Sequence, residues 1–322
     1  MGNKKVCVVG AGYWGKNHIK TLYELGSLGG IVENNTVLFQ DILKLYPNVE
    51  LYSSLEDALK NDYFSGFTLA TPAETHYELS KIIIEANKHL LVEKPFTLNI
   101  ENAEELIKLA DDNKVNLMVG HVLLFHPAVI KIKELITSGK IGKLQYIYSN
   151  RLNLGQVRTR ENVFWSLAPH DIAIFQYLSD SFPITVNAQG SAFLQKGIFD
   201  STITQLKYEN DIEGHIFVSW LHPFKEHRLV IIGSEAMISF EDSLKGKPLK
   251  LYSKKIDIKN GLPEKIDGPV KLIEFSPQMP LMGELSYFIE HLNGNKLKKA
   301  NGEHALDVTR ILVDAGRQLV KL

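Results

Sequence analysis

The 322-residue chain contains one cysteine, Cys7, and almost equal numbers of acidic and basic residues. A single thiol excludes an internal disulfide, and we expect Cys7 to be a small buried residue in a reducing compartment. With 36 basic and 37 acidic residues the formal net charge is -1, which gives no bulk attraction to nucleic acid or to an anionic membrane. The composition therefore favours neither a disulfide framework nor a nucleic-acid partner.

Long apolar runs and metal-ligand patterns are also missing. No stretch approaches the roughly 18 apolar residues of a membrane helix. The opening MGNKKVCVVG passes from two lysines directly into a predicted strand, without the apolar segment and cleavage site of a signal peptide. The eleven histidines include no H-E-x-x-H pattern and no Cys/His cluster. We therefore expect a cytoplasmic protein with no membrane partner and no metal.

What the sequence does contain is a regular alternation of short apolar runs and helical patterns from residue 4 to about residue 121. This alternation predicts right-handed crossovers and a doubly wound, mostly parallel sheet. After a helix that ends at Gly139, β-rich runs separated by short turns predict an open, mostly antiparallel sheet of four to six strands. The expected fold is α/β, with one domain over residues 1–121 and an α+β domain for substrate binding and oligomerisation over 122–322.

The stretch VVGAGYWG spaces Gly10, Gly12 and Gly15 as G-x-G-x-x-G, after a predicted strand and before a predicted helix. In this context the pattern is the dinucleotide fingerprint of a Rossmann-type domain. The first glycine permits a tight turn, the second lets the backbone approach a pyrophosphate, and the third lets helix and strand pack closely. The pyrophosphate would lie at the N-terminus of a helix beginning near Tyr13, with Tyr13 and Trp14 lining the same turn.

The cofactor type depends on Glu33, at the end of the second predicted strand. A carboxylate about 20 residues beyond the glycines accepts hydrogen bonds from the ribose hydroxyls and repels a 2′-phosphate. Neither Asn34 nor Asn35 supplies a positive charge for such a phosphate. The sequence therefore predicts NAD rather than NADP.

The stretch HLLVEKPF ends an apolar strand with Glu93, Lys94 and Pro95. Charges and a proline also end ordinary strands at a protein surface. In a dinucleotide-binding sheet, however, the carboxyl ends of the strands face the crevice that holds the cofactor, so Lys94 is expected beside the nicotinamide. A lysine there can hold a substrate hydroxyl and accept its proton while hydride leaves the same carbon.

The stretches VGAGYWGKNH, ATPAETHYEL, LLVEKPFTLN and VGHVLLFHPA together resemble the Gfo/Idh/MocA family of oxidoreductases, and the similarity continues through GKIGKLQYI and WSLAPHDI. The resemblance implies that Thr71, Pro72 and His76 lie along the nicotinamide side of the cofactor. It also implies that Glu93 and Lys94 lie at the cofactor, with Lys94 as the catalytic or substrate-orienting residue in a Lys-Pro bond that is often cis.

The resemblance further implies that His170 pairs with Lys94 over the reacting hydroxyl. Ser166, however, stands where many members have aspartate, and Ala168 where they have glycine. A serine cannot hold the charge of an imidazolium, which puts the aspartate-assisted proton relay in doubt. Asp171 could replace part of this function, although adjacent helix residues point apart.

The segment SNRLNLGQVRTREN, followed by NVFWSLAPHDI, is similar to family members that oxidise the 3-hydroxyl of UDP-N-acetylglucosamine or of its uronic acid. Arg151, Arg158 and Arg160 lie in this segment, and guanidinium forks suit a diphosphate or carboxylate, although they can equally make subunit or domain contacts. Asn153 and Gln156 are further candidates for sugar or uracil contacts. Two alternatives stay open: a dehydrogenase of a free polyol or aldose such as an inositol, and a non-catalytic dinucleotide-sensing protein.

The second predicted sheet also bears on assembly. In TITQLKY and GHIFVSW, apolar side chains alternate so that both faces carry large apolar groups. With helices on one face only, a monomer would expose an apolar patch on the other. Members of the family commonly pair through this face, so we expect a homodimer or a homotetramer built from it.

Overall fold

The computed structural model describes residues 4–159 and 161–319, which form two compact units. The first unit contains residues up to 125 and residues 278–309, and the second contains residues 126–277 and those from 310 on. This division differs from the single boundary expected after residue 121. The reason is a long-range contact: Val119 N donates to Ala300 O (2.8 Å), which brings the later segment alongside the last strand of the first sheet. Local periodicity carries no signal for such a contact.

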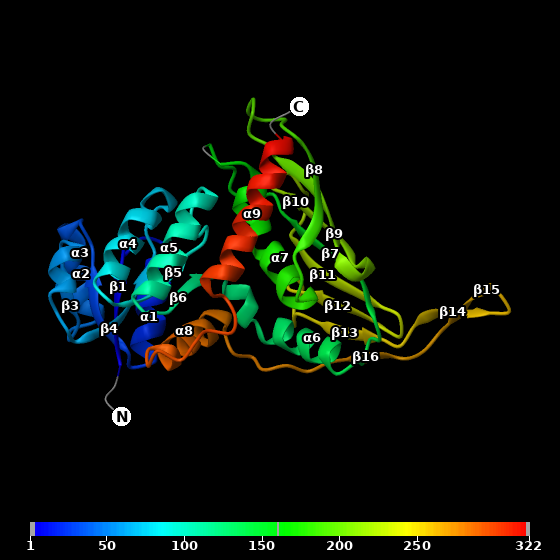
Figure 1. The fold of residues 1–322 in the computed structure, drawn as a ribbon, viewed down its shortest axis with the longest axis horizontal. Helices are drawn as coiled ribbons and strands as arrows, with labels where there is room; N and C mark the ends of the chain where they lie inside the picture. Colours follow the sequence, from blue (N-terminus) through cyan, green and yellow to red (C-terminus); the bar gives the residue numbers. More distant parts are fainter. Residues whose placement is uncertain (1–3, 160, 320–322) are drawn as a thin grey trace. The chain divides into compact units, whose positions relative to one another are not determined.

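The first unit is built on a six-stranded parallel sheet in the order β3-β2-β1-β4-β5-β6 (Figure 1). The strands are β1 (Lys5–Val9), β2 (Leu28–Val32), β3 (Glu50–Tyr52), β4 (Phe64–Leu69), β5 (His89–Glu93) and β6 (Leu117–Gly120). The predicted doubly wound sheet is confirmed. The strand order reverses direction at β1, so the carboxyl ends of β1 and β4 flank the switch point at which such sheets bind ligands.

Helices cover both faces of this sheet. They are α1 (Gly15–Glu24), α2 (Phe39–Leu45), α3 (Leu55–Leu59), α4 (His76–Glu85), α5 (Ile100–Asp112), α8 (Pro280–His291) and the beginning of α9 (Gly302–Leu319), with 3-10 turns η1 (Thr36–Leu38), η2 (Ala73–Thr75) and η3 (Val122–Phe125). Helix α1 packs on α8, and α4 packs on α5. The Ser54 side chain accepts from Asp57 N (3.2 Å) and caps the start of α3.

The second unit contains an eight-stranded sheet in the order β16-β13-β12-β11-β7-β10-β9-β8. Its strands are β7 (Leu144–Leu152), β8 (Pro183–Ser191), β9 (Ser201–Tyr208), β10 (Glu213–Ser219), β11 (Glu226–Gly233), β12 (Met237–Glu241), β13 (Leu249–Tyr252) and β16 (Val270–Leu272). All neighbouring pairs are antiparallel except β7 and β10. The mostly antiparallel sheet is confirmed, but the predicted four to six strands were too few because the short strands near the edge give little periodic signal.

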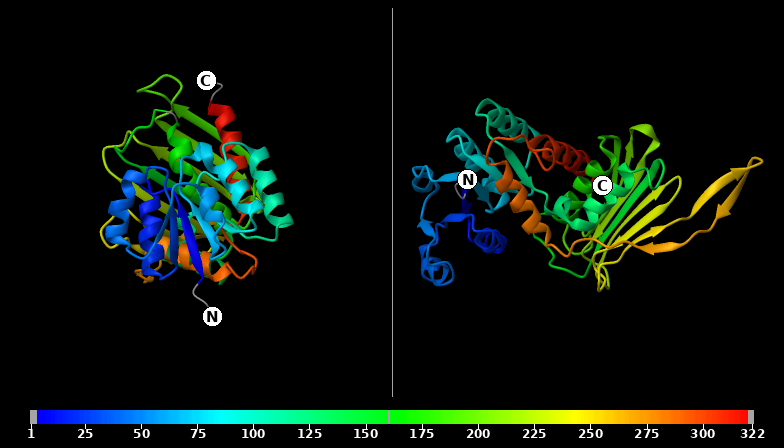
Figure 2. Two further views of the ribbon diagram at one scale, coloured as in Figure 1. Left: turned by 90° about the vertical axis from the view of Figure 1, so that its left-hand side faces the viewer. Right: turned by 90° about the horizontal axis from the view of Figure 1, so that it is seen from below.

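One face of this second sheet is covered by α7 (Val163–Ser179), which packs on β7, β9 and β10 and also on α6 (Pro127–Thr137). The alternation along β9 follows from this cover: Thr204 and Leu206 are buried, whereas Ile203 is 43% exposed. A short turn, η4 (Glu209–Asp211), joins β9 to β10. Figure 2 shows, as Figure 1 does, that the ribbon of β14 (Lys255–Lys259) and β15 (Leu262–Ile266) projects from the end of this sheet. In the described part of the chain, no helix is long and apolar enough to cross a membrane.

Candidate active site

The glycine turn after β1 has the backbone geometry that the motif predicts. Gly10 has φ +94°, and a Cβ there would lie 2.8 Å from Ala70 O. A Cβ on Gly15 would lie 1.9 Å from Gly10 O, so only glycine lets α1 approach β1 this closely. A Cβ on Gly12 would meet nothing within 4 Å. The open backbone at Gly12 and the adjacent helix N-terminus fit a bound pyrophosphate.

Helix α1 begins at Gly15, two residues later than the start expected near Tyr13. The turn itself occupies the intervening residues, and Lys16 N donates to Gly12 O (3.1 Å) across it. The Tyr13 side chain is 89% exposed. Tyr13 therefore stays a candidate cofactor contact, because its ring is accessible.

The Glu33 carboxylate lies at the end of β2 and reaches back to the glycine turn. Its Oε2 accepts a hydrogen bond from Ala11 N (2.9 Å), and its Oε1 accepts one from Asn35 N (2.9 Å). Two backbone donors hold the carboxylate in one orientation beside the turn. A carboxylate fixed at the end of the second strand, beside the glycine turn, is a candidate partner for the adenosine ribose of NAD.

Glu93 ends β5 as a buried carboxylate that contacts Trp14 of the glycine turn and His18 of α1. Its Oε1 accepts from the indole Nε1 of Trp14 and pairs with His18 Nε2 (2.9 Å), while its Oε2 accepts from Lys94 N (3.2 Å). Gly120 on the adjacent strand leaves room for this carboxylate, since a Cβ there would lie 2.8 Å from Glu93 Oε1. The hydrogen bond between Trp14 and Glu93 thus connects the glycine turn to the end of β5.

The loops after β4 and β5 are joined by His76. This ring is 1% exposed and lies between two backbone carbonyls, with Nδ1 2.8 Å from Pro95 O and Nε2 3.0 Å from Thr71 O. Thr71 also hydrogen-bonds through its hydroxyl to Thr75 (2.7 Å). His76 was predicted as a cofactor contact; its contacts in this unit hold the two loops together, one of which carries Lys94.

Lys94 follows β5 directly, at the carboxyl edge of the sheet. The Lys94–Pro95 peptide bond is cis, as the resemblance implied. The Lys94 side chain is partly exposed. Because Glu93 pairs with Gly120 in adjacent strands, Lys94 and His121 are the first residues beyond that pair and leave the sheet side by side.

Several buried polar side chains lie near this edge. His121 is 2% exposed and stacks on His304 (ring centroids 5.6 Å apart). Burial, then the nearby His304 and Lys94, lowers the pKa of His121 well below its ordinary value. The Glu284 carboxyl on α8 is fully buried, and burial followed by the negative charge of Glu93 raises its pKa well above the usual range. Both shifts favour the neutral form of the group.

In the second unit, His170 lies on α7 and is partly exposed. The next residue, Asp171, forms a two-point ion pair with Arg151 on β7: Nε to Oδ2 is 2.7 Å and Nη2 to Oδ1 is 3.0 Å. Burial opposes this pair, but Asp171 raises the pKa of the Arg151 guanidinium. Asp171 is thus engaged by Arg151, which argues against the idea that it replaces the missing aspartate of the family pattern at Ser166.

The other predicted substrate residues lie in the segment between β7 and α7. Asn153 is partly exposed, and its side chain lies over Gly155, where a Cβ would come within 2.2 Å of Asn153 Oδ1. Arg158 is exposed and lies 3.7 Å from Glu161, between Nε and Oε1. Arg160 lies outside the described residues.

Sequence reasoning did not identify His18 or Glu284 as parts of this region. His18 shares the apolar face of α1 with Leu22, a pattern typical of core packing. Its partner Glu93 is 75 residues away in the chain. Only the tertiary structure brings these side chains together, although a histidine on an apolar helix face could have been flagged as needing a buried partner.

Comparison with known proteins agrees with both halves of the chain. Residues 4–121 match the model of an oxidoreductase family with an NAD-binding Rossmann fold, and residues 129–239 match the Gfo/Idh/MocA C-terminal domain. The chain therefore belongs to the Gfo/Idh/MocA family, and its first unit contains an NAD-binding Rossmann domain. The family resemblance and the NAD prediction are both confirmed.

Among its relatives, a UDP-N-acetylglucosamine 3-dehydrogenase from Acidithiobacillus ferrooxidans is 27% identical over 198 residues, which cover 60% of this chain and 59% of the relative. An inositol 2-dehydrogenase from Corynebacterium glutamicum is 23% identical over 217 residues, covering 65% and 64%. The chain spans 40% to 63% of the length of three curated relatives that it matches.

Solved structures show the same fold. The structure of UDP-N-acetylglucosamine 3-dehydrogenase GnnA from Acidithiobacillus ferrooxidans has a TM-score of 0.87 at 20% identity, covering 100% of this chain and 99% of that one. The WlbA dehydrogenase from Bordetella pertussis, in complex with NADH and UDP-GlcNAcA, has a TM-score of 0.78 at 19% identity, covering 99% and 97%. At these identities the likeness supports the fold.

Proposed function

We propose that the protein is an NAD-dependent dehydrogenase that oxidises a secondary alcohol of a sugar, the 3-hydroxyl of a UDP-N-acetylhexosamine or its uronic acid. The observation that carries the proposal is the position of Lys94 at the carboxyl edge of an NAD-binding sheet, held between the Glu93 and His76 contacts. The substrate class is supported by the relative that acts on UDP-N-acetylglucosamine and by the fold of WlbA.

The chain's own residues would act as follows. The glycine turn and the α1 N-terminus would bind the pyrophosphate, and Glu33 would bind the adenosine ribose. Bound NAD would supply the hydride acceptor. Lys94 would hold the substrate hydroxyl and accept its proton as the carbon is oxidised to a ketone. His170 would hydrogen-bond the same hydroxyl.

A free polyol or aldose is the alternative substrate, favoured by the similarity to inositol 2-dehydrogenase. Calorimetric titration with UDP-N-acetylglucosamine and with free N-acetylglucosamine separates the two classes. Tight binding of the nucleotide form only supports the proposal. Binding and oxidation of myo-inositol in preference to both would contradict it.

Lys94→Ala tests catalysis, and a non-catalytic dinucleotide-sensing protein would show no turnover to lose. We expect turnover to fall by about a hundred- to ten-thousand-fold, because general-base contributions are of this size. The affinity for NAD should change little. His170→Asn should act in the same direction but less severely, and a Lys94→Ala enzyme that stays within a few-fold of the parent would refute the assignment.

We also propose that the protein forms a homodimer or homotetramer through the face of the second sheet opposite α7. This face carries partly exposed aromatic rings, among them Tyr148 stacked on His215 with centroids 5.1 Å apart. Ile203 adds an apolar side chain that is 43% exposed. Such a surface is typical of an isologous contact between two copies.

A further inference from the structure

A buried carboxylate in the second unit, Asp200, holds the exposed loop around Phe193 in place by hydrogen bonds. Asp200 is fully buried, and its Oδ2 accepts hydrogen bonds from Phe193 N (2.6 Å) and Leu194 N (2.9 Å). Its Oδ1 accepts from the indole Nε1 of Trp220 (2.7 Å), a ring that is itself 2% exposed. Although burial acts to raise the pKa of Asp200, these three donors lower it, so the group is an anion with all its bonds inside the protein.

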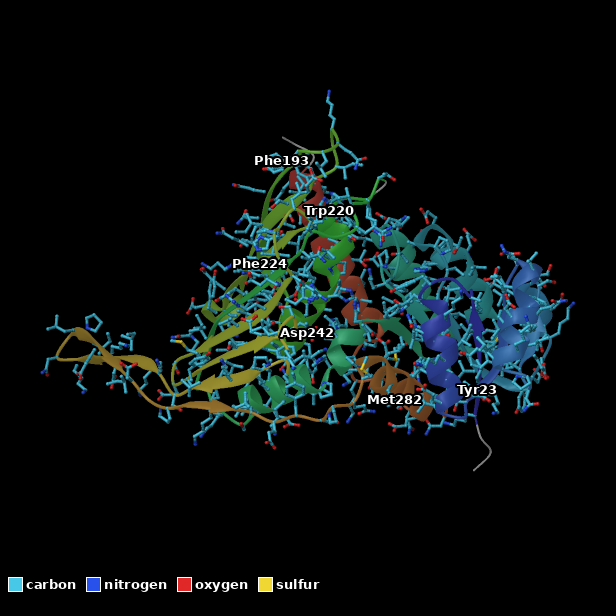
Figure 3. The ribbon with its side chains drawn as sticks, turned by 180° about the vertical axis from the view of Figure 1, so that it is seen from behind. Tyr23, Phe193, Trp220, Phe224, Asp242 and Met282 are labelled. Atoms are coloured by element: carbon cyan, nitrogen blue, oxygen red, sulfur yellow. The ribbon has the colours of Figure 1, made fainter. Side chains whose placement is uncertain are left out.

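The consequence is that two apolar side chains point into solvent. With both backbone amides bound to Asp200, the Phe193 and Leu194 side chains are 71% and 53% exposed. Phe193 and Trp220, which both donate a hydrogen bond to this carboxylate, are labelled in Figure 3. Burying the Asp200 charge costs free energy, and the bonds that it makes leave the Phe193 ring exposed. An exposed ring contributes no hydrophobic stabilisation to the fold. Such an arrangement is typical of a ligand-binding surface.

Two further segments meet at the same loop. Gln195 Nε2 donates to Arg158 O (3.0 Å), so the segment that carries the exposed Arg158 guanidinium lies against the loop. Val163 N donates to Phe199 O (2.9 Å), so α7 begins where the loop ends. The loop that carries Phe193 is therefore hydrogen-bonded both to the segment that carries Arg158 and to the start of the His170 helix.

We propose that Phe193 stacks on the base of a nucleoside diphosphate and that Arg158 binds its phosphates, with Asp200 as the positioning residue. The inference rests on the proposed function and assigns residues to the nucleotide part of the substrate. A ring stacks on any base, and a guanidinium fork matches phosphate oxygens. From the start of α7 to His170 is seven residues, about 10 Å at 1.5 Å per residue, which separates the nucleotide end from the sugar end.

The test is calorimetric titration of the full chain with UDP and with uridine. Phe193→Ala should raise the Kd of UDP roughly tenfold or more, since stacking on a base contributes about 1–3 kcal/mol. Phe193→Tyr keeps a ring and should retain UDP affinity. Phe182→Ala is the matched control, because this partly exposed phenylalanine follows the opposite end of α7, about 24 Å from its start, and it should leave UDP binding unchanged.

Arg158→Ala should weaken UDP binding and leave uridine binding unchanged, because only UDP carries the phosphates. Asp200→Asn should weaken both, since an amide has one acceptor oxygen and cannot accept from the loop N–H groups and from the Trp220 indole at the same time. In turnover with a UDP-sugar, Phe193→Ala should raise KM with little change in kcat, the signature of lost uniform binding.

Two results would overturn the inference. The first is a UDP affinity that is unchanged in Phe193→Ala. This result would overturn the inference even if light scattering showed that the variant has lost subunit contacts, because the ring would then serve assembly and not UDP binding. The second is a parent protein that oxidises a free sugar and binds no UDP, which refutes the nucleotide-sugar proposal together with this site. A parent that binds UDP beside a Phe193→Ala variant that binds it equally well refutes only the site.

Discussion

Arg151→Met should destabilise the protein strongly. The guanidinium and the Asp171 carboxylate form two hydrogen bonds, and their side chains are only 11% and 3% exposed. Removing the arginine leaves a buried carboxylate without its cation. Breaking a buried pair in this way costs about 3–5 kcal/mol, which is about two to four powers of ten in the unfolding equilibrium constant.

Urea unfolding followed by tryptophan fluorescence measures this loss, since the buried Trp220 lies in the same unit as the pair. The double variant Arg151→Met with Asp171→Leu is the control, because it removes both charges and should recover much of the stability. Substrate affinity, measured with the folded variants, should then depend little on Arg151.

The opposite pattern would refute this reasoning. Suppose that the free energy of unfolding of Arg151→Met stays within about 1 kcal/mol of the parent value and that the variant loses affinity for a UDP-sugar. The guanidinium then binds the substrate, as the sequence first suggested. The ion pair with Asp171 would then be exchanged for a ligand contact on binding.

Three further predictions concern the cofactor, a buried acid and the assembly. Glu33→Ala should reduce the preference for NAD over NADP, because the carboxylate that repels a 2′-phosphate is removed. A parent enzyme with the same kcat/KM for both cofactors would contradict the assignment. Glu284 has a folded-state pKa above its unfolded value, so its contribution to stability is present below the unfolded carboxyl pKa and is lost as pH rises above it. Glu284→Gln should therefore flatten the fall of the urea midpoint as pH rises above the ordinary carboxyl range, and curves that stay parallel for parent and variant would count against this prediction. Phe217→Glu, on the face of the second sheet opposite α7, should shift light scattering toward the 36.3 kDa monomer, whereas a parent that is already monomeric at micromolar concentration would remove the proposed interface.

The parts of the fold that sequence reasoning predicted are those with a strong local period. The strands around Cys7 and Leu91 are continuous apolar runs, which central strands of a parallel sheet require. By contrast, α2 and β3 were not identified, because β3 has three residues and α2 buries only Ile42. The return of residues 278–309 to the first unit depends on hydrogen bonds between distant segments, such as Asn116 Nδ2 to His291 O (2.8 Å), which no local pattern reports.

The candidate site divides in the same way. The positions of Gly10, Gly15 and Lys94 could be predicted because they depend on backbone turns and on strand ends, which a short motif encodes. Arg151 was interpreted as an anion-binding residue because its partner is 20 residues away, on a helix whose packing the sequence does not show. The sequence shows that an arginine needs an anionic partner. Only the fold shows whether that partner is another side chain of the protein or a ligand.

This distinction bears on Ser166. In the family pattern an aspartate at this position would support the histidine that faces the lysine. Here the neighbouring acid, Asp171, is held by Arg151 on β7 and is not available for that purpose. The proposed reaction therefore relies on neither Ser166 nor Asp171 to support His170, and we assign proton acceptance to Lys94. This is why we expect Lys94→Ala to be more damaging than His170→Asn.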